Sequence, residues 1–172
     1  MEYNADLARD FIRRTFDIIN QYDNLDIESK KYEVTLRVNC LLGLIIFTKA
    51  RFYKDLSFKI PKKGKYYEVL IEKNNGEGSY VVEESDLGDA KIILHCLRNG
   101  LAHWMEREEN SDNLKFESNE ESEISRIIIK GTGSLDGGGY GVRLEIKKVP
   151  EGLDEFLNRI HENILKDNYV KG

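Results

Sequence analysis

Several hallmarks of common protein classes are missing from this sequence. No apolar run approaches the roughly 18–20 residues that a membrane-spanning helix needs, and the longest, CLLGLIIF at 40–47, is far too short. The first residues, MEYNADLARD, are acidic and lack the apolar run of a signal peptide. We therefore expect a cytoplasmic protein that has no membrane partner.

Motifs for metal or cofactor chemistry are also missing. The two cysteines, Cys40 and Cys96, lie in apolar, helix-like segments and are expected to be buried thiols. Together with His95 they lack the spacing of a zinc site. The glycine-rich GTGSLDGGGYG at 131–141 lacks the Gly-Lys-Ser/Thr end of a phosphate-binding loop and is better explained as a hairpin tip. We expect no metal and no cofactor.

The bulk composition is that of a globular protein. Of 172 residues, 40% are hydrophobic and 33% are charged, which favours one domain with a hydrophobic core. The formal net charge of -5 argues against passive coating of nucleic acid, because such binding depends on neutralising phosphates. A local basic patch remains compatible with it.

Hydrophobic spacing predicts helices and a smaller amount of β-structure. Apolar residues recur at three- and four-residue intervals in segments 4–22, 29–48, 86–107 and 151–166. For 29–48 the β-branched content leaves a strand pair as the competing interpretation, although its length favours a helix. Ser85 or Asp86 is a candidate cap for the third helix.

Alternating patterns predict two hairpins. Segments 125–130 and 141–149 flank the glycine-rich stretch, and a small hairpin is expected around Asn75-Gly76. The predicted fold is therefore mainly α: an up-and-down helical bundle with β-hairpins inserted toward the C-terminal half, roughly at 113–149. We treat 1–172 as a single domain.

Polar residues interrupt the apolar pattern of the third helix at HCLRNGLAHW, 95–104. Asn99 and His103 are four residues apart and share one helix face, while Arg98 is long enough to lean toward His103. Gly100 costs about 1 kcal/mol of helix propensity relative to alanine, which suggests that a backbone or a ligand approaches there. The plainer interpretation is a solvated helix edge.

The segment LRNGLAH resembles the Arg-x4–6-His signature of the higher eukaryotes and prokaryotes nucleotide-binding (HEPN) superfamily. YEVTLRVNCLLGLIIF, at 32–47, also resembles the preceding helix of a bacterial branch. The resemblance covers about residues 5–105, and Gly100 stands where alanine or another small residue is expected. It implies a homodimer whose motif helices face each other, in a metal-independent endoribonuclease of antiviral defence or a toxin–antitoxin system. An antitoxin or another defence component would then be a partner.

The chemistry of the motif fits RNA cleavage by the 2′-hydroxyl. Histidine titrates near pH ~6.5 and can accept or donate a proton, while arginine can hold the phosphate and stabilise its growing charge. We expect Arg98, Asn99 and His103 to be catalytic, with Asn99 orienting His103 or binding the phosphate or ribose. One histidine supplies one proton role, so two symmetry-related copies would complete the site. A non-catalytic dimeric RNA- or nucleotide-binding module and a monomeric structural domain are the alternatives.

A basic stretch at 49–67 interleaves lysines with aromatic residues. This combination suits a single-stranded RNA track, in which cations contact phosphates and rings stack on bases. The alternative is a solvated loop whose aromatic side chains turn into the core. The candidate RNA-binding residues are Lys59, Lys62, Lys63 and Lys65.

Overall fold

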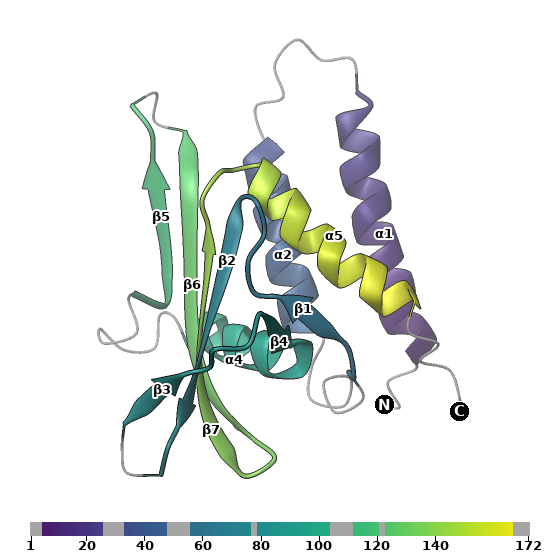
Figure 1. Cartoon of the computed structure of the whole chain (residues 1–172). Coiled ribbons are helices and arrows are strands. Elements are labelled where there is room, and N and C mark those ends of the chain that lie inside the picture. The colour runs from purple at the N-terminus through teal and green to yellow at the C-terminus, as the bar shows by residue number, and fades with distance from the viewer. Residues whose placement is uncertain are drawn as a thin grey trace.

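The computed structural model describes residues 5–25, 33–47, 56–76, 79–103, 112–120 and 123–166. Figure 1 shows a twisted sheet of long strands beside a group of helices. The elements, in chain order, are α1 (Ala5–Asp23), α2 (Glu33–Phe47), β1 (Lys59–Pro61), β2 (Tyr67–Asn74), β3 (Tyr80–Val82), β4 (Leu87–Asp89), α4 (Ala90–Ala102), β5 (Leu114–Ser118), β6 (Ile124–Leu135), β7 (Gly138–Ile146) and α5 (Glu151–Lys166).

The strands form two antiparallel sheets. Five of them lie in the order β3-β2-β7-β6-β5, and β1 pairs with β4 in a separate two-stranded sheet. The fold of the described chain is therefore α+β, and the prediction of a mainly α, up-and-down bundle with inserted hairpins is wrong.

The error comes from pairing between distant segments. Strand β2 pairs with β7 from Tyr67↔Ile146 to Lys73↔Tyr140, which joins the two predicted hairpins into one sheet. Local patterns reveal each hairpin but not this contact, because its partners lie some 70 to 80 positions apart in the chain. The β-structure consequently extends well outside 113–149.

The predicted C-terminal hairpin is confirmed, but its strands are longer than expected. Strand β6 runs through the glycine-rich segment to Leu135, and the turn itself is Asp136-Gly137, with φ angles of 50° and 83°. Left-handed backbone of this kind suits glycine and, less often, aspartate. The glycines before the turn thus belong to the strand rather than to a hairpin tip.

The predicted helices are largely confirmed. Segment 151–166 is α5, segment 4–22 is α1 shifted by one residue, and 29–48 is helical from Glu33 to Phe47 rather than a strand pair. The third helix begins only at Ala90, because the preceding residues pair with β1 as strand β4. Its expected last residues, 104–107, lie outside the described part of the chain.

The helices cover one face of the five-stranded sheet. Val69, Leu144 and Ile129 lie in one row across β2, β7 and β6 and are buried in the core. The next row, which points to the opposite face, contains Arg143 and Lys130. This alternation is typical of an antiparallel sheet with one face packed and one face open. None of the described helices has the length and apolar character to cross a membrane.

Candidate functional site

Helix α4 holds the motif and is fixed in the core by its apolar face. Ile93, Leu94 and Leu97 are almost fully buried, and α4 packs against β6, β7 and α2. At its N-terminus the side chain of Asp89 accepts a hydrogen bond from Lys91 N at 2.9 Å, so Asp89 is the N-cap. The expected caps Ser85 and Asp86 lie before strand β4.

Gly100 is the point where α4 meets the sheet. A Cβ atom at this position would lie 1.8 Å from the backbone oxygen of Lys130, and one at Gly131 would lie 1.8 Å from that of Cys96. Only two glycines allow the two backbones to approach this closely. The expectation that a backbone comes close at Gly100 is confirmed, and that backbone is strand β6 of the same chain.

The structure brings Arg98 and Asn99 together. Arg98 Nη1 donates a hydrogen bond to Asn99 Oδ1 at 3.0 Å, and Asn99 Nδ2 donates to Thr132 O at 3.2 Å. Asn99 Nδ2 also lies 3.3 Å from His95 Nε2. Because an amide NH2 can only donate, this contact is a hydrogen bond in the neutral tautomer of His95 that carries its proton on Nδ1.

The surroundings of His95 disfavour its charged form. Burial lowers the pKa of its imidazole below the ordinary value, and the positive charge of Arg98 lowers it further. Both effects disfavour the charged ring, in agreement with its role as an acceptor for Asn99. His95 therefore supports the position of Asn99.

His103 ends helix α4 at the surface. It is the C-cap, its backbone N–H donates to Asn99 O at 3.1 Å, and its side chain is exposed. His103 and Asn99 line one groove, whereas Arg98 does not. The motif is thus divided, with Arg98 bonded to Asn99 on one side and His103 facing the groove on the other.

The groove has a volume of about 780 Å³ and passes from α4 to the open face of the sheet. Among the described residues that line it, the cations are Lys130 and Arg143 and the one carboxylate is Glu72. A positively charged groove beside an exposed histidine can hold a phosphate near a proton-transfer group. Its lining residues are Leu70, Glu72, Asn99, Gly100, His103, Asn113, Lys130, Gly131, Thr132, Gly141, Val142 and Arg143.

The expected RNA-binding lysines lie elsewhere. Lys59 pairs with Asp89 at the start of α4, and the helix extends about 20 Å from there to His103 at its end. Lys62 is buried, and its ammonium donates to the backbone oxygen of Glu83 at 2.6 Å. The structure does not bring this part of the chain to the motif.

The other two lysines of that stretch are exposed. Lys65 lies over the ring of Tyr66, with 4.8 Å from Nζ to the ring centroid, and Lys63 forms an isolated β-bridge with Glu68. Lys59 is exposed as well, so the surface of this region offers Lys59, Lys63 and Lys65 to a ligand. That they bind RNA stays a prediction.

The part of the chain that the structure describes contains no set of metal ligands. No three His, Cys, Asp or Glu side chains are grouped there to hold an ion. Both cysteines are buried, and burial raises the pKa of the Cys96 thiol to about 12. Its Sγ lies 3.7 Å from Tyr140 O, so this thiol is part of the packing of α4 on the sheet.

A family model described as HEPN pEK499 p136 matches residues 1–169. The chain belongs to this HEPN family. The match extends well beyond the segments that carried the resemblance and includes the sheet and the last helix. No protein of curated function and no solved structure matches the chain.

The groove contains residues that the sequence analysis did not single out. Lys130, Arg143 and Thr132 come from two strands whose register had to be known before they could be placed together. His95 had a weaker signal, because it lies four residues before Asn99 on the same helix face. The spacing alone could have suggested that contact.

Proposed function

We propose that this HEPN protein is a metal-independent endoribonuclease that cleaves RNA by attack of the 2′-hydroxyl, at a composite site on a dimer interface. The observation that carries the proposal is the placement of His103 in a groove with Asn99, Lys130 and Arg143. The proposal sets the protein in the cytoplasm, in antiviral defence or a toxin–antitoxin system, with an antitoxin or another defence component as partner.

His103 is the proton-transfer residue of this proposal. It is exposed at the groove, where an RNA phosphate and the neighbouring 2′-hydroxyl can reach its imidazole. A histidine accepts the hydroxyl proton in its neutral form and protonates the leaving 5′-oxygen in its charged form. The products are a 2′,3′-cyclic phosphate and a 5′-hydroxyl.

Arg98 and Asn99 supply charge and orientation. Asn99 lines the groove and is fixed by Thr132 O, so its position is set before a ligand arrives. Arg98 lies outside its own groove, held against Asn99, and keeps donors of its guanidinium for the pentacovalent phosphate in the groove of a second copy. Preformed donors of this kind need little rearrangement in the transition state.

A second copy would supply the other proton role. Arg98 lies on the side of α4 opposite Cys96 and Gly100, together with the exposed Ala102. If two copies of α4 face each other here, each groove gains the partner's arginine and histidine around a two-fold axis. The small side chain of Ala102 favours a close approach of the two helices.

The test is cleavage of single-stranded RNA in the presence of EDTA. We expect His103→Ala and Arg98→Ala each to reduce the rate by at least about 100-fold, while circular dichroism and the melting temperature remain those of the native protein. The native protein should release 2′,3′-cyclic phosphate ends. If His103→Ala protein cuts RNA as fast as the native chain, the proposal is wrong.

One observation favours a rival function. Arg98 and Asn99 both make contacts within the chain, as residues of a non-catalytic binding module would. In such a dimeric RNA- or nucleotide-binding module, Arg98→Ala would weaken dimerisation or ligand binding, and the native protein would not cut RNA. The cleavage assay separates the two functions, whereas the oligomeric state does not.

A further inference from the structure

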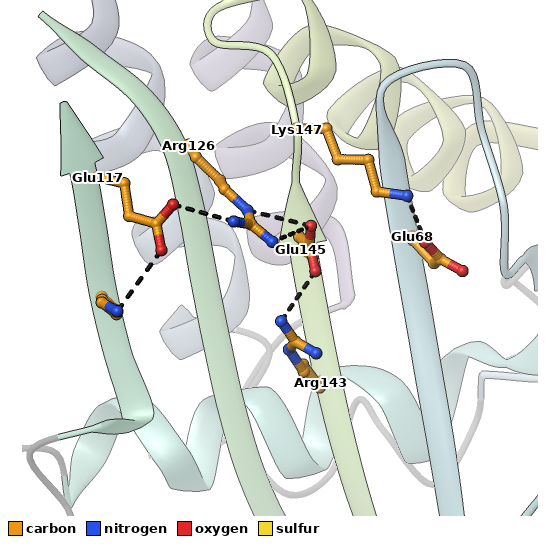
Figure 2. A network of polar contacts seen from close by, with 7 residues as sticks. Glu68, Glu117, Arg126, Arg143, Glu145 and Lys147 are labelled. Carbon is orange, nitrogen blue, oxygen red and sulfur yellow. Dashed lines mark hydrogen bonds and ion pairs between the residues drawn. The ribbon is translucent and has the colours of Figure 1, made fainter. Parts of the chain in front are cut away.

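Ion pairs cover much of the open face of the five-stranded sheet. Arg126 donates to Glu117 at 3.0 Å and to Glu145 at 2.6 Å, and Lys147 pairs with Glu68 (Figure 2). These contacts run across β5, β6, β7 and β2. The cations of this network are therefore neutralised by carboxylates of the same face.

Lys130 differs from these cations. It is exposed and makes no hydrogen bond or ion pair with any residue in the described part of the chain. It also lies directly opposite Arg143 in the register of β6 and β7. Like charges in directly opposite positions destabilise a sheet. A pair of cations that breaks this rule is typical of a functional site.

Arg143 is only partly neutralised. Its Nη2 donates to Glu145 Oε2 at 2.9 Å, but Glu145 also accepts from Arg126. The Nε of Arg143 is buried and finds no hydrogen-bond acceptor among the described residues. A buried donor without an acceptor is costly. The rest of the Arg143 side chain is about 40% exposed, so its guanidinium can still meet an anion.

These two cations border the groove that contains His103. Strand β5 pairs with β6 only as far as Ile129, so the groove can pass around the edge of β6 from Lys130 onward. Its floor on the open face includes the small residues Thr132 and Gly141. The histidine, Lys130 and Arg143 therefore border one continuous groove.

We propose that Lys130 and Arg143 form a phosphate-binding subsite that holds the RNA backbone next to the phosphate at His103. This inference rests on the proposed function and specifies its substrate. The two side chains would hold one phosphate between them, with the ammonium of Lys130 and the exposed part of the Arg143 guanidinium donating to its oxygens. The RNA then runs from the end of α4, around the edge of β6, onto the open face of the sheet.

The groove fits a single strand bound through its backbone. Its volume is that of a site for one small molecule, whereas a duplex is recognised over a long, shallow surface. None of the described residues that line it is aromatic, and the lining cations contact phosphates rather than bases. We therefore expect binding at this subsite to depend little on base sequence.

The experiment measures binding of a fluorescent single-stranded RNA of about 12 nucleotides, with every 2′-hydroxyl methylated so that it cannot be cleaved. Lys130→Gln and Arg143→Gln should each raise the dissociation constant about tenfold. Each should also reduce the slope of log affinity against log salt by about 0.7, the value for one phosphate contact on a single strand. Lys147→Gln, which removes a paired cation from the same face, should bind as the native chain does.

Three results would overturn the subsite: unchanged affinity of both variants, an equal loss in Lys147→Gln, or no binding by the native chain. An acidic peptide that competes as well as RNA would also overturn it, since this would indicate a general anion surface. The outcome is independent of cleavage. If the native chain cuts unmodified RNA, and the Lys130→Gln and Arg143→Gln variants bind the methylated RNA as tightly as the native chain does, only the subsite is refuted. A chain that binds through them but does not cut refutes the nuclease alone.

Discussion

At the residue scale, Gly100 determines which side of the motif helix faces the sheet. Because α4 and β6 are in backbone contact there, Cys96 and Gly100 point to the sheet, and Arg98 and Ala102 point away from it. Asn99 lies between these two directions and hydrogen-bonds across to Thr132. One missing side chain therefore positions the other residues of the motif.

We predict that Gly100→Ala destabilises the protein by about 1–3 kcal/mol or more, because the added methyl group overlaps the backbone of Lys130. This cost exceeds the roughly 1 kcal/mol that alanine gains in helix propensity. Denaturant unfolding measures the difference. Gly43→Ala in α2 is the matched control, since its Cβ would lie 3.4 Å from Phe11 Cζ and should be neutral or stabilising. Equal effects of the two substitutions would contradict this explanation.

The residues of the site could be predicted only in part. Arg98, Asn99 and His103 follow from a short motif on one helix, and Asn99 and His103 do share a groove. Lys130 and Arg143 could not be found in this way, because they lie in different strands and meet only through the register of β6 and β7. That these residues catalyse cleavage or bind RNA stays a prediction.

At the element scale, periodicity predicted helices well and the sheet poorly. Helix α5 has the expected ends because its apolar spacing is local to one segment. Strand β2 also has a clear alternation, in which Tyr67, Val69 and Ile71 are buried, but a local pattern does not name its partner. The sheet is built from distant pairings, so the amount of β-structure was underestimated.

The start of α4 offers a test of how this element is defined. Asp89 accepts a hydrogen bond from Lys91 N, so Asp89→Ala should destabilise the protein by about 1 kcal/mol in denaturant unfolding. Asp86, the cap expected from the sequence, is exposed and lies before β4, so Asp86→Ala should change stability much less. If Asp86→Ala lost more stability than Asp89→Ala, Asp89 would not be the residue that caps α4.

At the scale of the whole molecule, two surfaces of the described part of the chain lie beside the motif. One is the side of α4 that carries Arg98 and Ala102, and the other is the charged face of the sheet. Our proposals place a second copy of the chain on the first and RNA on the second. His103 lies where the two surfaces meet, at the end of α4.

This arrangement predicts that a charge at Ala102 separates the dimer. Ala102 is exposed, so Ala102→Glu should leave the fold of each protomer unchanged while light scattering shows the mass of one chain instead of two. The cleavage rate should fall when the dimer is lost, because the histidine of the second copy no longer supplies the other proton transfer. A native chain that is itself monomeric, or an Ala102→Glu protein that stays dimeric, would contradict the interface.

The proposed function depends most on the reaction at His103, and one comparison tests that reaction directly. Single-stranded RNA and the same RNA with every 2′-hydroxyl methylated are incubated with the native protein in EDTA, and the ends of any fragments are identified. We predict that only the unmodified RNA is cut, with 2′,3′-cyclic phosphate ends. Cleavage of the methylated RNA, or 3′-hydroxyl ends on the fragments, would contradict the account.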